Sequence, residues 1–188
     1  MDDGNRSHDV RPQAFSIGPW LATMVGFGLR RLAFGLAIRP NRILRSIHSY
    51  AWRKSKIHVC FDGEGKELGA LVIDGKQVTG TLQIPENLLR NGDVDVKVTL
   101  GEKGPERPCL VDSSVRLLEC EPGDAGFVYT IETYGMNRMV FRSLGKGEAV
   151  VLDAKDKEVE TSFRKQHGHG WLEFEGSGEM TVRVKKSA

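Results

Sequence analysis

The side chains with the most chemical potential in this sequence lie between Gln166 and Trp171, in the run QHGHGW. His167 and His169 are two positions apart, so on an extended strand both imidazoles lie on the same side. A metal site needs at least a third ligand, such as Glu173 or a residue distant in sequence. A solvated turn between two strands explains the pair more simply, and we therefore predict no metal ion and no cofactor.

The same run also suits a carbohydrate ligand. Trp171 follows a glycine-rich turn and would present an apolar ring beside polar donors, which fits a sugar, although Trp lies more often in a core. A second segment, Tyr134–Arg138 (YGMNR), is predicted as a comparable turn with an aromatic ring, an amide and a guanidinium. The predicted ligand-binding residues are Tyr134, Asn137, Arg138, His167, His169 and Trp171.

Catalytic signatures are missing from the sequence. It contains no GxSxG, Walker, Rossmann or HExxH motif. Two pairs of carboxylates, Glu119 with Glu121 and Glu173 with Glu175, alternate along predicted strands and could reach the separations of a glycosidase. An outward polar sheet face explains them more simply, so we predict no catalytic residues.

The elements that must position these side chains are strands. From Val94 to Leu100 apolar and polar residues alternate strictly, which is the period of a half-buried strand. Similar runs recur about every ten residues between turn sequences such as Asp74-Gly75 and Gly176-Ser177-Gly178, a spacing typical of an antiparallel β-sandwich. The predicted inward positions are Val94, Val96, Val98, Leu100, Phe127, Tyr129, Ile131, Leu172, Phe174, Val182 and Val184.

The segment Thr81–Leu100 carries a family resemblance. Its order of Leu-x-Ile-Pro, two adjacent leucines, Gly92 and an alternating strand resembles galactose-binding-like jelly-roll domains attached to carbohydrate-active enzymes. Those domains usually have Asn after the glycine, where this chain has Asp93. The resemblance covers about twenty residues and implies a jelly-roll sandwich with a carbohydrate ligand.

The first part of the chain differs in character from the rest. Residues 1–13 are polar and predicted as a disordered tail, and residues 14–55 as a basic, apolar helical arm in front of a sandwich domain at 56–188. The arm comprises an apolar helix over Phe15–Ile38 and a basic amphipathic helix over Asn41–Ser55. The apolar helix could lie at a membrane interface or against protein, span or re-enter a membrane, or pack on the sandwich.

Charge separates the same two parts. Residues 1–61 hold ten Lys/Arg and three Asp, a net charge of +7, whereas residues 62–188 carry a net charge of −5. A basic arm with tryptophans suits an anionic membrane surface, which we expect as its partner rather than nucleic acid. The predicted membrane-binding residues are Trp20, Arg30, Arg31, Arg42, Arg45, Trp52, Arg53 and Lys54.

These patterns predict a non-catalytic, glycan-binding or accessory sandwich held at a membrane surface. Three widely spaced cysteines favour a reducing compartment, and hence a cytoplasmic, membrane-peripheral location. The alternatives are a protein-interaction or assembly module and a carbohydrate-active hydrolase or lyase. Convergence of Trp171 with its polar neighbours would favour a glycan, and their separation would favour the interaction module. We also expect a fragment without residues 1–55 to fold.

Overall fold

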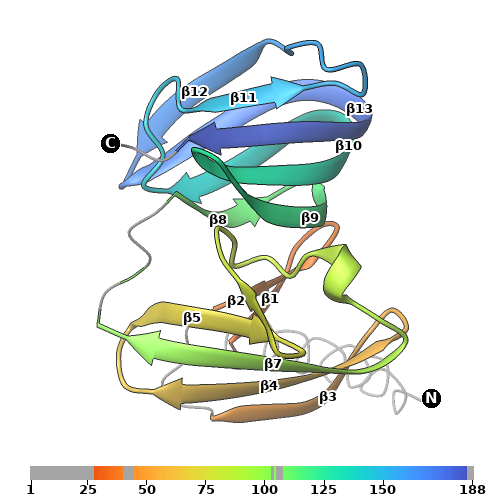
Figure 1. Cartoon of the computed structure of the whole chain (residues 1–188), viewed down its shortest axis with the longest axis vertical. Coiled ribbons are helices and arrows are strands. Elements are labelled where there is room, and N and C mark those ends of the chain that lie inside the picture. Colours follow the sequence, from red (N-terminus) through yellow and green to blue (C-terminus); the bar gives the residue numbers. More distant parts are fainter. Residues whose placement is uncertain (1–27, 40–44, 103, 105–107, 186–188) are drawn as a thin grey trace, which may run out of the picture.

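The computed structural model describes residues 28–39, 45–102, 104 and 108–185, and these form three β-sheets (Figure 1). The small sheet pairs β1 (Leu29–Arg31) with β2 (Leu36–Ile38). The β3–β7 sheet contains β3 (Ser46–Trp52), β4 (Ser55–Gly63), β5 (Glu67–Ile73), β6 (Lys76–Val78) and β7 (Gly92–Gly101). The β8–β13 sheet contains β8 (Cys109–Ser113), β9 (Arg116–Gly123), β10 (Gly126–Arg142), β11 (Ala149–Leu152), β12 (Thr161–Gln166) and β13 (His169–Lys185). A short 3₁₀ turn, η2 (Glu86–Leu88), precedes β7.

Alternation of apolar and polar residues produces these strands, as the sequence indicates. In β7 every second residue from Val94 to Leu100 is buried and the residues between them are exposed. All eleven predicted inward positions are at most 5 % exposed, so this part of the prediction is confirmed. The chain is therefore mainly β, with most strand pairs antiparallel.

One strand pair departs from the predicted antiparallel arrangement. In the order β3-β4-β7-β5-β6, β4 and β7 run parallel, from Ser55 opposite Gly92 to Gly63 opposite Leu100. Parallel neighbours require a long crossover, which the chain between them supplies through β5, β6 and η2. The prediction of a purely antiparallel sandwich is therefore wrong at this pair.

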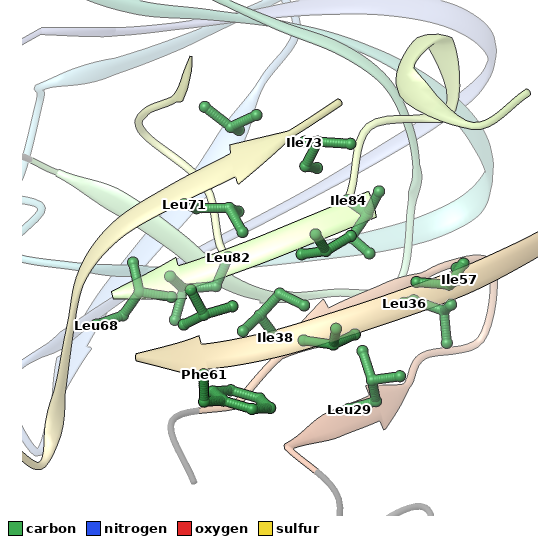
Figure 2. Packing of buried hydrophobic residues seen from close by; sticks show 14 of the residues in the cluster. Leu29, Leu36, Ile38, Ile57, Phe61, Leu68, Leu71, Ile73, Leu82 and Ile84 are labelled. Carbon is green, nitrogen blue, oxygen red and sulfur yellow. The ribbon is translucent and has the colours of Figure 1, made fainter. Parts of the chain in front are cut away.

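A second layer covers the inner face of the β3–β7 sheet. Leu29, Leu36 and Ile38 of the β1–β2 hairpin pack against that sheet, together with residues of the extended segment 80–84 (Figure 2). The Ile38 N–H donates to the Leu82 carbonyl oxygen at 2.7 Å, and the Leu82 N–H donates to the Leu110 carbonyl oxygen at 2.8 Å. Segment 80–84 thus links β2 to β8. It joins the half of the molecule that contains the small sheet and the β3–β7 sheet to the half that contains the β8–β13 sheet.

Of the predicted helical arm at residues 14–55, the structure describes residues 28–39 and 45–55, and these form strands and turns and no helix. Residues 29–31, 36–38 and 46–52 are β1, β2 and β3, and β3 pairs with β4 across the boundary expected after residue 55. The spacing of the apolar residues is compatible with a helix or with strands. These residues form strands because β3 pairs with β4 and β2 hydrogen-bonds segment 80–84. Residues 1–27 and 40–44, including most of the predicted apolar helix, lie outside the described residues.

The β8–β13 sheet is built on one long antiparallel pair of strands, β10 and β13. β10 and β13 are each 17 residues long and pair from Gly126 opposite Lys185 to Arg142 opposite His169. The turns predicted at Tyr134–Arg138 and Gly176–Gly178 are wrong, because both segments continue their strands. Gly135 at φ +75° and Gly178 at φ +91° let the strands bend there without reversing.

Candidate functional site

Trp171 lies between two arginines on the outer surface of the β8–β13 sheet. Arg164 is directly opposite Trp171 on β12, and Arg138 lies on β10, the neighbour on the other side of β13. The guanidinium carbons lie 4.5 Å (Arg164) and 5.1 Å (Arg138) from the centroid of the Trp171 ring. Each such cation–π contact contributes about 0.5–1 kcal/mol at an exposed site, so the three side chains hold one another in place.

Carboxylates neutralise two of the three arginines on this surface, which are Arg30, Arg138 and Arg164. Arg164 Nη2 lies 3.1 Å from Glu173 Oε1, and Arg30 Nη2 of β1 lies 2.9 Å from Asp112 Oδ2 of β8. Arg138 Nη2 is 4.0 Å from the same Asp112 oxygen, at the limit of an ion pair. Arg138 is therefore the least neutralised cation of this group.

Large apolar side chains lie beside these arginines on the outer surface of the β8–β13 sheet. Tyr134, Met136 and Arg138 alternate along β10 and point to the outer side of the sheet. The turn of the β1–β2 hairpin reaches up to the β8–β13 sheet (Figure 1), where the ring centroids of Phe34 and Tyr134 are 5.3 Å apart. We call Phe34, Tyr134, Met136, Arg138, Arg164 and Trp171 the aromatic–arginine face.

A charged cluster holds the hydroxyl end of Tyr134. Arg116 Nη1 donates to Glu132 Oε2 at 2.8 Å, and this hydrogen bond is the main cause that lowers the pKa of Glu132. The Tyr134 hydroxyl also hydrogen-bonds Glu132, which raises the pKa of Tyr134. Arg53 of the β3–β4 turn joins the cluster through Glu86, at 2.7 Å. Tyr134 is therefore held by both its ring and its hydroxyl.

The six predicted ligand residues do not form one site. Asn137 is 3 % exposed and points inward, where its Nδ2 donates to the carbonyl oxygens of Gly135 and Gly176. His167 lies at the tip of the β12–β13 turn, and its carbonyl oxygen accepts a hydrogen bond from His169 Nδ1 at 3.0 Å. Tyr134, Arg138, His169 and Trp171 share the outer surface of the sheet.

Sequence reasoning missed Phe34, Met136 and Arg164. Phe34 lies in the run that was predicted as an apolar helix, and Met136 lies in a segment that was predicted as a turn. Arg164 had a usable signal, because it faces Trp171 across the two-residue turn at His167-Gly168.

Of the predicted membrane-binding side chains that the structure describes, those of Arg30, Arg45, Trp52 and Arg53 make contacts within the protein. Trp52 is 7 % exposed within the core of the β3–β7 sheet. Arg30 and Arg53 form ion pairs, and Arg45 Nη1 donates to the Gly63 carbonyl oxygen at 2.9 Å. Lys54 is exposed in the β3–β4 turn. Trp20, Arg42 and the side chain of Arg31 lie outside the described part of the chain.

No helix among the described residues is both long enough and apolar enough to span a membrane.

The described residues contain no group of three or more His, Cys, Asp or Glu side chains that could hold a metal ion. Burial is the main cause that raises the pKa of the Cys109 and Cys120 thiols to about 12, so both stay protonated at neutral pH. Of the carboxylates predicted to pair, Glu119 Oε1 accepts a hydrogen bond from Asn87 and Glu173 binds Arg164.

Comparison of the chain with protein-family models, with curated proteins and with solved structures finds no match.

Proposed function

We propose that this chain is a non-catalytic protein-interaction module that binds its partner through the aromatic–arginine face. One observation carries the proposal: the exposed large hydrophobic side chains of the described residues are Phe34, Tyr134 and Met136, which gather on this face. They are 37 %, 53 % and 71 % exposed, respectively. Single exposed apolar residues need no explanation, but a contiguous group marks an interaction surface.

The composition of the face supports a protein partner. Aromatic residues, Met and Arg are enriched at protein–protein interfaces, and Trp, Tyr and Arg dominate their binding hot spots. Five of the six side chains stand on paired strands, and Phe34 lies in the β1–β2 turn. Contacts between them, Tyr134 with Phe34 and Arg138 with Trp171, hold these side chains in place. Binding therefore costs less side-chain entropy than it would on a mobile loop.

A glycan-binding function is the second candidate. It is supported by the shared outer surface of Trp171, Arg138 and His169, which places a ring beside donors. A sugar stacked on Trp171 would have to displace one of the two guanidinium groups, which weakens this candidate. A glycan array with wild type and Trp171→Ala separates the two: glycan binding that is lost in the variant would replace our proposal.

Attachment to an anionic membrane is a separate proposal. Within the described residues it is supported by the exposed Lys54, and otherwise it rests on predicted residues outside them. Co-sedimentation with liposomes of neutral lipid, with and without added anionic lipid, tests it directly. Binding that needs the anionic lipid supports peripheral attachment, and equal binding to both contradicts it.

Differential capture from an extract of the source cells tests the interaction module. Wild type, Met136→Glu and the control Lys97→Glu, an exposed residue of β7, serve as parallel baits. We expect a protein that is retained by wild type and Lys97→Glu and depleted at least tenfold on Met136→Glu, and that binds wild type directly after purification. Captured proteins that bind all three baits equally would contradict the proposal.

A further inference from the structure

We infer that the partner inserts an acidic side chain at Arg138, next to an apolar side chain that covers Met136. This inference rests on the proposed function and names the chemistry of the partner. The guanidinium of Arg138 is rigidly placed and incompletely paired.

The backbone and the side chain of Arg138 are both fixed. Its N–H donates to Ser114 Oγ at 2.8 Å, and its carbonyl oxygen accepts from the Ser114 N–H at 2.9 Å. The guanidinium stacks on Trp171 at 5.1 Å and is 42 % exposed as a side chain. A guanidinium placed in this way loses little freedom when a ligand binds.

The hydrogen-bonding capacity of Arg138 is largely unused. Within the described residues its Nε is buried without an acceptor, so a ligand must bind at the Nη groups, and the nearest carboxylate oxygen, on Asp112, is 4.0 Å from Nη2. That oxygen is already 2.9 Å from Arg30. A carboxylate suits the two Nη groups of Arg138, because the planar fork of Arg matches two carboxylate oxygens.

The charges around Arg138 favour an anion. Three cations, Arg30, Arg138 and Arg164, form ion pairs with two carboxylates, Asp112 and Glu173, and a further carboxylate of this surface, Glu175, lies opposite Met136. An incoming carboxylate can bind Arg138 without displacing a close ion pair.

The side chain next to Arg138 favours a partner that is apolar as well as acidic. Met136 lies two residues before Arg138 on the same side of β10 and is 71 % exposed. Two residues along a strand span roughly 7 Å, which is also the distance between side chains at i and i+2 of an extended peptide. We therefore expect a partner segment that carries Asp or Glu two positions from a large apolar residue.

Selection from a displayed library of random dodecapeptides on wild-type protein tests this chemistry. We expect the enriched peptides to share Asp or Glu two positions from an apolar residue, and to bind at least tenfold more weakly to Arg138→Gln. Arg138→Lys keeps the charge without the fork and should weaken binding less. Arg183→Gln, an exposed arginine at the other end of β13, is the matched control and should bind like wild type.

Substitutions in the peptide and in the protein together test the contact between the acidic residue and Arg138. Replacing the acidic residue of the peptide by its amide should weaken binding to wild type as Arg138→Gln does, with little further loss when both changes are combined. The inference is wrong if the enriched peptides bind Met136→Glu weakly but lack an acidic residue, or bind Arg138→Gln as tightly as wild type; the proposed function would then stand. If the peptides bind both variants as tightly as wild type, or if no peptide is enriched, the inference and the proposed function are both contradicted.

Discussion

Adjacent residues of β10 have opposite roles. Asn137 points inward and hydrogen-bonds the backbone where the two long strands bend, whereas Arg138 points outward and stacks on Trp171. From sequence alone both residues are predicted in one ligand site, because residues 134–138 resemble a turn. In a continuous strand the period of two separates them, and only Arg138 remains available to a ligand.

Loss of the Asn137 side chain should destabilise the protein. Asn137→Ala removes a buried amide and its two hydrogen bonds to the carbonyl oxygens of Gly135 and Gly176, and at about 0.5–1.5 kcal/mol for each bond the loss is about 1–3 kcal/mol. Met136→Ala, one residue earlier and exposed, should change the free energy of unfolding by less than about 0.5 kcal/mol. Urea unfolding of the two variants measures the difference, and equal stabilities would show that Asn137 is not structural.

At the scale of elements, strands were predictable where a simple alternation held. Val94 to Leu100 and Phe127 to Ile131 alternate cleanly and were placed correctly. The continuity of β10 and β13 was hidden by glycines at 135, 176 and 178, which usually mark turns in a sequence. β1 and β2 were hidden in a long apolar run, since three-residue strands are too short to show a period.

The two-residue turn between β12 and β13 places Arg164 opposite Trp171. His167 at φ +50° and Gly168 at φ +77° have the positive angles of a type I′ hairpin turn. A Cβ on Gly168 would meet no atom within 4 Å, so Gly168→Ala tests backbone conformation alone. We expect it to lower the free energy of unfolding by about 1–2 kcal/mol.

The adjacent substitution provides the control for this turn. His167→Asn should leave stability within about 0.5 kcal/mol or raise it, because Asn-Gly is preferred in type I′ turns. Chemical denaturation of both variants gives the comparison. A Gly168→Ala protein as stable as wild type would argue against this turn geometry.

At the scale of the whole molecule, the buried apolar residues form two clusters. One lies under the β3–β7 sheet and the other under the β8–β13 sheet. Polar contacts connect them: Tyr129 Oη donates to the Gly80 carbonyl oxygen at 2.7 Å, and Ser113 Oγ donates to Gln83 Oε1 at 2.7 Å. Such long-range contacts leave no periodic signal in the sequence, so the division could not be predicted from it.

Deletion of residues 1–55 should prevent folding, contrary to the expectation from sequence. It removes Leu29, Leu36, Ile38 and Trp52 from the first cluster and strand β3 from its sheet. Losing a single buried Leu side chain costs about 2–5 kcal/mol, and a whole domain is stable by only about 5–15 kcal/mol. Thermal unfolding followed by circular dichroism tests this. A soluble fragment with a cooperative transition would contradict the assignment of these strands to the core.

The aromatic–arginine face is a property of the whole fold, because it needs the β1–β2 hairpin and three strands of the β8–β13 sheet. Trp171 and Arg138 were identified from sequence as aromatic and charged residues near glycines. Their convergence with Phe34, more than 100 positions earlier in the chain, depends on segment 80–84 joining the two halves.

The most direct test of the interaction face is methyl NMR of protein labelled at its methionines, titrated with the captured partner. Met136 is 71 % exposed on the face, whereas Met139 and Met180 are 0 % and 4 % exposed in the core. The Met136 signal is assigned by its loss in Met136→Leu. We predict that the Met136 methyl signal shifts or broadens in proportion to bound partner while those of Met139 and Met180 stay in place. An unchanged Met136 signal at saturating partner would contradict the assignment of the face.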